Sequence, residues 1–190
     1  MAYHQSICPQ SELDQRIRNL QHRLCRAEVD GALIIQKTDL YYFSGTGQQG
    51  WLYIPAEGNP LLMIFKDFDR ACQESELEKI VSIASSKKIP ELLSEKGYAR
   101  PKRIGMELDV LPANLYLSYQ KLFQSSVIID ISSQIREIRA IKSPYEIERI
   151  KESAERSDKM AALFPELIEE GLTEISLAGK IEAYARELGH

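Results

Sequence analysis

Apolar residues recur along the chain at two spacings, which predict helices and strands in alternation. A helix that Ser11 and Asp14 can cap is predicted near the N-terminus, because apolar residues follow at helical spacing: Leu13, Ile17, Leu20 and Leu24. A turn at Asp30 leads into the nearly continuous apolar run 31–36. Such a run is typical of a strand that is covered on both faces.

Two further apolar runs, 50–54 and 60–65, flank the turn sequence 56–59 and predict an antiparallel hairpin. The elements then alternate: a helix near 69–76, a strand near 79–83, a helix near 89–96, a strand at 103–107, a helix after Pro112 and a strand at 127–131. In the helix after Pro112, four residues are expected to face inward: Leu115, Tyr119, Leu122 and Phe123. This alternation predicts an α/β sandwich built on a mixed sheet.

Strand periodicity gives way to helical periodicity between 132 and 143. Ser143, Pro144 and Glu146 match the cap, first and third positions of a helix start. Gly171 is expected to end this helix in a left-handed cap, and a second helix is expected over about 174–188. The predicted organisation is a domain at 1–132, a linker at 133–143 and two helices at 144–190.

Charge and composition narrow the functional classes. A net charge of -4 and a pI near 5.5 argue against nonspecific nucleic-acid binding, which needs a basic face. The three cysteines, Cys8, Cys25 and Cys72, lack Cys-x-x-Cys spacing, and Cys25 is expected to fill a small space at the core boundary. With no signal-peptide pattern and no apolar run of bilayer length, the expectation is a soluble cytoplasmic protein.

The histidines and acids offer little catalytic chemistry. His4, His22 and His190 are not paired with carboxylates at metal-ligand spacing. Four acids near predicted strand ends suggest a nuclease that holds two Mg²⁺ ions: Asp30, Glu107, Asp109 and Asp130. That alternative is disfavoured because such nucleases need an acid inside the first strand, whereas 32–35 is wholly apolar.

Four runs of residues, in order along the chain, resemble one family. They are 39–46 (DLYYFSGT), 104–107 (IGME) followed by Leu111-Pro112, 139–147 (RAIKSPYEI) and 171–174 (GLTE). These runs resemble segments of the creatinase, prolidase and aminopeptidase P family, the "pita-bread" dinuclear metallopeptidases. The resemblance extends from about Leu13 to Gly189.

The resemblance implies a ribonuclease H-like α/β/α sandwich with a mixed sheet, followed by the first two helices of a truncated catalytic domain. The family binds two divalent metal ions (Mn, Co or Zn) through two Asp, one His and two Glu, and these ligands would lie beyond His190. The expectation is therefore a noncatalytic domain without catalytic or metal-binding residues. Its parent would be a Xaa-Pro metallopeptidase that hydrolyses short proline-containing peptides.

In the resembled enzymes, the N-terminal domain of one subunit overhangs the active site of its partner. The expected partners are therefore the chain's own catalytic domain and a second copy in a homodimer. The residues expected to lie near substrate or at the interface are Tyr42, Gly47, Gln48, Gln49 and Trp51. For the aromatic run 41–43 and for Trp51, packing in the core near the sheet end is the competing interpretation.

Two other functions stay open. One is a free-standing binding or dimerisation module that has no catalytic half. The other is a creatinase-like parent, which would act on an amidine rather than on a peptide.

Overall fold

The computed structural model describes residues 7–189 and divides into two compact units between Ile141 and Lys142. The first unit holds a six-stranded sheet in the order β4-β3-β2-β1-β5-β6. Its strands are β1 (Gly31–Ile34), β2 (Gly50–Pro55), β3 (Leu61–Ile64), β4 (Ile80–Ser82), β5 (Arg103–Met106) and β6 (Val127–Asp130). Each strand overlaps one predicted from the sequence.

The directions of the strands confirm the mixed sheet. β2 runs antiparallel to both of its neighbours, β1 and β3, whereas β1–β5, β3–β4 and β5–β6 are parallel pairs. The predicted hairpin is therefore β2–β3. The carboxyl ends of five strands and the start of β2 consequently meet at one edge of the sheet, which we call the carboxyl edge.

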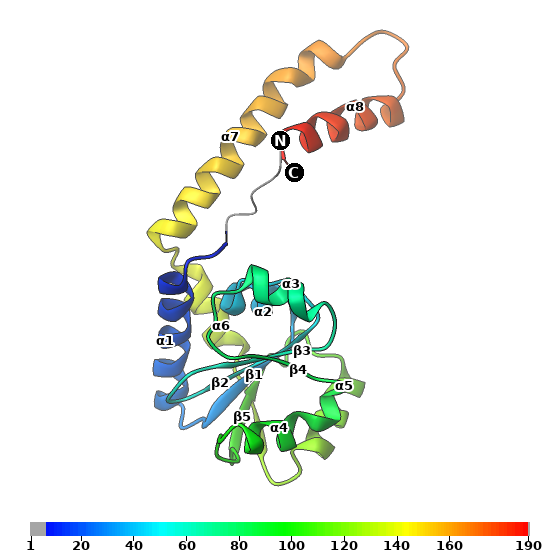
Figure 1. Cartoon of the computed structure of the whole chain (residues 1–190). Coiled ribbons are helices and arrows are strands. Elements are labelled where there is room, and N and C mark those ends of the chain that lie inside the picture. The colour runs from blue at the N-terminus through cyan, green and yellow to red at the C-terminus, as the bar shows by residue number, and fades with distance from the viewer. Residues whose placement is uncertain (1–6, 190) are drawn as a thin grey trace. The chain divides into compact units, whose positions relative to one another are not determined.

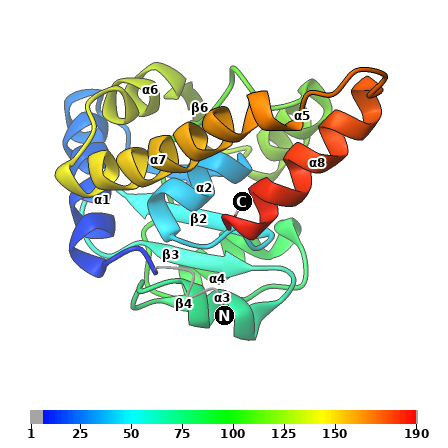
Figure 2. The ribbon, with the colours of Figure 1, turned by 90° about the horizontal axis from the view of Figure 1, so that it is seen from above.

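Helices cover both faces of this sheet (Figures 1 and 2). On one face lie α1 (Gln10–Arg26), α2 (Lys37–Ser44), α3 (Phe68–Glu74) and α6 (Ser132–Ala140). On the other face lie α4 (Ile89–Glu95), which follows a short 3-10 turn at Ser86–Lys88, and α5 (Ala113–Leu122). The unit is an α/β/α sandwich, as expected.

The core consists of residues that alternate along the central strands. A cluster on the α4 and α5 face includes Leu33, Tyr53, Met63, Ile104 and Tyr119. Their neighbours in the strands, such as Ala32, Ile34 and Leu52, point to the opposite face and are also fully buried. Burial on both faces explains why β1 to β3 have almost no polar residue.

Helix α1 differs from its prediction at both ends. It begins at Gln10 with Pro9 at the cap position, so Ser11 and Asp14 lie inside the helix and do not cap it. The fixed φ of Pro9, −58°, already suits a helix entry without a side-chain cap. Near the other end, Cys25 is exposed rather than a filler of the core boundary, although the apolar stripe beside it is buried as expected.

Two other segments also depart from their predictions. The aromatic run 41–43 lies in helix α2, which was not predicted and which the Gln36 side chain caps and left-handed Gly45 ends. Phe43 is buried in the core, as the packing interpretation expected, whereas Tyr41 is exposed. In α5, Tyr119 and Phe123 are buried as expected, but Leu115 is exposed. Leu115 lies in the first turn of α5, and the helix packs through its later turns.

The segment expected to be a linker contains helix α6. Ile135 and Ile138 are buried on one side of it, and this apolar stripe holds the helix against the sandwich. The first compact unit accordingly continues to Ile141 rather than ending near 132.

The second unit contains α7 (Pro144–Leu167) and α8 (Glu174–Glu187). Ser143 and Glu146 form the predicted capping box, and Thr173 caps α8 as expected. Gly171 has the expected positive φ, +84°, but α7 already ends at Leu167. Pro165 lacks the N–H that would bond to Ala161, and this weakens the last turn. None of the helices within residues 7–189 is long and apolar enough to cross a membrane.

Candidate functional site

The segment from Gly45 to Trp51 links α2 to β2 at the carboxyl edge of the sheet and includes the first two residues of β2. It contains four of the five residues expected to lie near substrate: Gly47, Gln48, Gln49 and Trp51. Gly47, Gln48 and Trp51 are partly exposed, and Gln49 is exposed. The structure therefore brings these four residues together on one accessible loop, which we call the edge loop (residues 45–51).

Glu74, at the end of α3, anchors the edge loop through hydrogen bonds. Its carboxylate accepts hydrogen bonds from Thr46 Oγ1 at 2.7 Å and from Gln48 Nε2 at 3.0 Å, and it pairs with Arg70 Nε at 2.7 Å. Partial burial raises the pKa of Glu74, but these bonds outweigh burial and leave its pKa below the ordinary value. Glu74 is therefore an ionised anchor that restricts the loop.

Aromatic contacts fix the other end of the edge loop. Trp51 Nε1 donates to the Tyr119 hydroxyl at 2.6 Å, and the Trp51 ring meets Phe65 edge to face at 6.4 Å between centroids. The backbone amide of Phe65 also donates to Gln49 O at 2.8 Å. Trp51 packs against the core, as the competing interpretation predicted, yet it remains partly accessible and lies beside Phe65, which is also exposed.

Tyr42, the fifth expected residue, lies apart from the edge loop in α2. The Arg16 guanidinium stacks over its ring at 4.2 Å and donates from Nη1 to Tyr42 O at 2.7 Å. A second cation, Arg139, lies 5.8 Å from the same ring and donates to Asp39 Oδ1 at 2.7 Å. Tyr42 therefore belongs to a structural junction between α1, α2 and α6.

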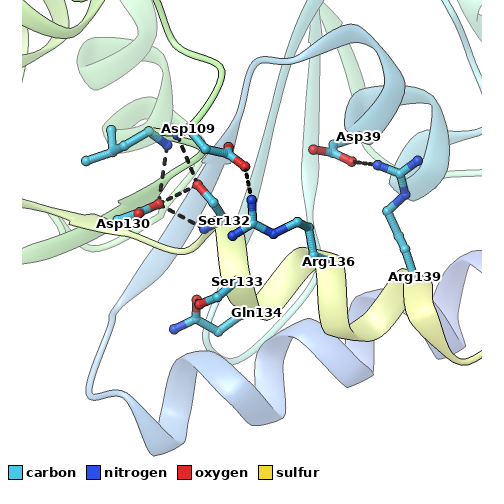
Figure 3. A network of polar contacts seen from close by, with 9 residues as sticks. Asp39, Asp109, Asp130, Ser132, Ser133, Gln134, Arg136 and Arg139 are labelled. Atoms are coloured by element: carbon cyan, nitrogen blue, oxygen red, sulfur yellow. Dashed lines mark hydrogen bonds and ion pairs between the residues drawn. The ribbon is translucent and has the colours of Figure 1, made fainter.

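Polar contacts along α6 continue this junction (Figure 3). Arg136 pairs with Asp109 at 2.6 Å, and Asp130 accepts bonds from the backbone and side chain of Ser132. Arg136 and Arg139 project from α6 toward acids on two different segments, the β5–α5 connection and α2. Asp39, Asp109 and Asp130 thus hold α6 in place.

Glu107 follows β5 and is the most buried acid of this edge, at 2 % exposure. Its Oε2 accepts from the amide of Ile35 at 3.0 Å, and its Oε1 has no hydrogen-bond partner among the described residues. Burial raises the pKa of Glu107 to about 8, and the negative charge of Asp39 adds to this effect. A carboxyl with this pKa keeps its proton at neutral pH.

These acids do not form a metal centre. Within residues 7–189 there is no group of three or more His, Cys, Asp or Glu side chains that could hold a metal ion. Asp30 accepts from the amides of Lys102 and Arg103 at the start of β5, at the opposite edge from Glu107. The nuclease arrangement is therefore not formed, and the dinuclear metal pair of the resembled enzymes does not fit the residues present. His4 and His190 lie outside the described residues.

Sequence reasoning missed three residues that organise this region: Arg16, Glu74 and Arg139. Arg139 was noted only as the first residue of the run 139–147, with no partner assigned, whereas Arg16 carried a signal in the periodicity, because it occupies a position on the buried stripe of α1 between Leu13 and Ile17. A charged residue at such a position must find partners. Glu74 and Arg139 act across 28 and 100 residues of sequence, respectively, and periodicity cannot detect contacts of that range.

Comparison with known proteins adds a second line of information. Residues 16–141 match the family described as the creatinase/prolidase N-terminal domain. The chain is 25% identical over 178 residues to the uncharacterized peptidase YqhT of Bacillus subtilis, and 26% identical over 172 residues to a Xaa-Pro dipeptidase of Pyrococcus furiosus. These alignments cover 92% and 90% of this chain but 49% and 47% of the relatives.

A solved structure shares the fold. The Xaa-Pro dipeptidase from Bacillus anthracis superposes with a TM-score of 0.81 at 23% identity, over 93% of this chain and 50% of that one. The chain therefore spans about half the length of the proteins that it matches.

Proposed function

Because this chain belongs to the creatinase/prolidase N-terminal domain family, we propose that it is the noncatalytic N-terminal half of a Xaa-Pro peptidase. The observation that carries this proposal is the extent of the match. Curated relatives that include Xaa-Pro dipeptidases align along nearly all of this chain, yet along only about half of their own length. The remaining half of the protein would contain the peptidase chemistry.

The second unit fits this division. Its helices α7 and α8 carry apolar residues that are exposed, among them Ile147, Ile150, Phe164 and Ile175. Helices of this kind need a partner surface to bury their apolar stripe. We propose that α7 and α8 are the first two helices of the catalytic domain, and that the rest of that domain covers them.

The catalytic domain would also supply the metal ions. Within residues 7–189 no three His, Cys, Asp or Glu side chains are grouped so that they could hold a metal ion, so we assign the proposed pair of divalent ions (Mn, Co or Zn) to residues after His190. The contribution of this chain is to shape access to that site. The edge loop, anchored by Glu74 and Trp51, is the surface that we assign to this role.

We further propose that the protein forms a homodimer, in which the edge loop of one subunit borders the active site of the other. An overhanging loop restricts a site to short peptides only if the loop keeps its shape. The bonds from Thr46 and Gln48 to Glu74 and the Trp51–Tyr119 bond meet that requirement. The exposed cysteines Cys25 and Cys72 are not in disulfides, which agrees with the cytoplasmic location that we propose.

The test compares this chain with the product of the gene read past codon 190. The continuation is expected to encode Asp, Asp, His, Glu and Glu in that order. The longer protein should cleave a Xaa-Pro dipeptide when Mn²⁺ or Co²⁺ is added, whereas residues 1–190 alone should not. A stop codon after His190 would instead favour the free-standing module, and cleavage by residues 1–190 alone would refute the proposal.

The role of the edge loop has its own test in the longer protein. Deleting residues 46–49 should change kcat/KM for Xaa-Pro dipeptides, or the discrimination between short and long peptides. The control is Glu57→Ala, on an exposed residue of the β2–β3 turn at the opposite edge of the sheet, which should leave kcat/KM unchanged. Equal kinetics for the deletion and the unaltered protein would remove the edge loop from the proposed site.

A further inference from the structure

Strand β6 forms an outer edge of the sheet, and half of its backbone groups have no strand to bond to. The amides of Val127 and Ile131 donate to backbone oxygens on the β5 side, at 2.7 Å and 3.1 Å. Because successive residues of a strand turn their N–H and C=O groups to opposite sides, Ile128 and Asp130 point these groups away from β5. The sheet order of the described chain ends at β6, so no further strand takes them.

The outer side of β6 lacks the features by which edge strands usually avoid pairing. Such strands are protected when they are very short or carry Lys or Pro. β6 begins with three apolar residues, Val127, Ile128 and Ile129; all four of its residues are at least partly exposed, and Val127 is 59% exposed. The other edge strand, β4, has only three residues and directly follows Lys79. β6 is therefore the edge on which another strand can pair.

The register of β6 fits a second copy of the same strand. About a two-fold axis through Ile128, an antiparallel partner strand places Ile128 opposite the partner's Ile128, and each donates its amide to the carbonyl of the other. Val127 then lies opposite the partner's Ile129. These two apolar side chains cover each other, which removes the exposed surface of Val127 from water.

The ends of β6 suit the same register. The amide of Asp130 can donate to the carbonyl of the partner's Ser126, whereas the amide of Ser126 already donates to Phe123 O at 2.7 Å and needs no partner. Asp130 faces an uncharged serine rather than another acid, and its carboxylate stays bonded to Ser132 of its own chain. The pairing thus gives every outward amide of β6 an acceptor and opposes no like charges.

We propose that two copies of this chain pair antiparallel along β6, which joins their sheets edge to edge. This contact holds together the homodimer of the proposed function, and to that extent the inference rests on the proposed function. Strands β1 and β5 separate β6 from β2, so the pairing leaves the edge loop uncovered.

Hydrogen exchange of the intact chain tests the pairing residue by residue. As the protein concentration rises from about 10 µM to about 1 mM, the amides of Ile128 and Asp130 should come to exchange at least about tenfold more slowly than unbonded amides. The amides of Val127 and Ile131 are bonded within the single chain and should exchange slowly at every concentration. Exchange at Ile128 and Asp130 that stays as fast as in an unbonded amide at the highest concentration would contradict the pairing.

Two variants separate this contact from association through the helices of the second unit. Val127→Lys puts a charge opposite the partner's Ile129 and should raise the dissociation constant of the dimer at least about tenfold, as measured by analytical ultracentrifugation. The sandwich tolerates the change because Val127 is exposed, and Trp51 fluorescence during urea unfolding checks this. The matched control, Ile175→Lys, adds the same charge to an exposed apolar position of α8 and should leave the dissociation constant unchanged.

Three results would overturn the proposal. They are a chain that stays monomeric at about 1 mM, a dimer that Val127→Lys does not weaken, and a dimer that Ile175→Lys abolishes. The exchange measurement on the unaltered chain depends on neither variant. No readout involves peptide cleavage, so failure of the pairing and failure of the proposed peptidase role are told apart.

Discussion

Arg139 donates a hydrogen bond to Asp39 at 2.7 Å, although the two residues are 100 positions apart in the sequence. Asp39 belongs to the run 39–46 and Arg139 to the run 139–147, so two of the motifs that suggested the family are in direct contact. The pair ties the last helix of the sandwich, α6, to a helix near its start, α2.

Removing the Arg139 side chain should therefore destabilise the first unit. Arg139→Ala leaves the carboxylate of Asp39, which is mostly buried, without its cation, and the expected loss is about 1–3 kcal/mol of unfolding free energy. This loss of unfolding free energy is measured by following Trp51 fluorescence during urea unfolding. The control is Arg136→Ala on the same helix, whose ion pair with Asp109 is more exposed and should contribute less than about 1 kcal/mol. Equal losses in the two variants would contradict this ranking.

The stability of the first unit should depend on pH through Glu107. Between about pH 4.5 and about pH 8 the unfolded chain has released this proton while the folded chain still binds it. The folded state then holds more protons, so stability falls as pH rises through this interval. The expected total loss of unfolding free energy across this interval is about 3–5 kcal/mol, because each unit of pKa difference corresponds to about 1.36 kcal/mol. Urea unfolding at several pH values should show this slope in the unaltered protein and a much smaller slope in Glu107→Gln.

Two glycines of the edge loop should respond differently to a methyl group. A Cβ at Gly50 would lie 2.2 Å from the backbone oxygen of Met63, which cannot move without breaking the β2–β3 pairing. Gly50→Ala should therefore lower the unfolding free energy by about 3 kcal/mol or more. At Gly47 the nearest atom is the flexible end of Lys37 at 4.0 Å, so Gly47→Ala should change stability by less than about 1 kcal/mol. Thermal unfolding of both variants makes the comparison.

The anchor of the edge loop can be tested separately from global stability. Glu74→Ala removes the carboxylate that accepts hydrogen bonds from the side chains of Thr46 and Gln48. The backbone amide of Gln48 should then exchange its hydrogen at least about tenfold faster, which corresponds to a loss of about 1.4 kcal/mol in the free energy of local opening. Glu76→Ala, on an exposed residue close by in sequence, is the matched control. Unchanged exchange at Gln48 in Glu74→Ala would show that the loop keeps its shape without this anchor.

The elements that the sequence predicted well are those whose signal is local. The strands β1 to β3 are apolar on both faces, and the capping box of Ser143 and Glu146 spans only four residues. Helix α2 was missed because its ends depend on the Gln36 side chain, which is an uncommon cap, and on Gly45 in the left-handed conformation. Helix α6 was missed because its short apolar stripe, Ile135 and Ile138, resembles a linker until its packing partners are known.

In the candidate site, too, the features that could be predicted from the sequence are the local ones. Proximity in sequence was enough to group Gly47, Gln48, Gln49 and Trp51 on one loop. Tyr42, which was predicted with them, lies apart from this loop in α2, where Arg16 and Arg139 contact its ring. The partners that give the edge loop its shape, Glu74 and Tyr119, come from later segments and were not associated with it.

The position of α6 also determines when the domain can be completed during synthesis. This helix is the last part of the sandwich to be made, yet it pairs with α1 through Glu137 and Arg23, and with α2 through Arg139 and Asp39. The ribosome must therefore release all of α6 before the sandwich can close. Translation of residues 142–190 then takes about 2–10 s at about 5–20 residues per second. During that interval α6 leaves the ribosome, and the sandwich can close once all of α6 has emerged.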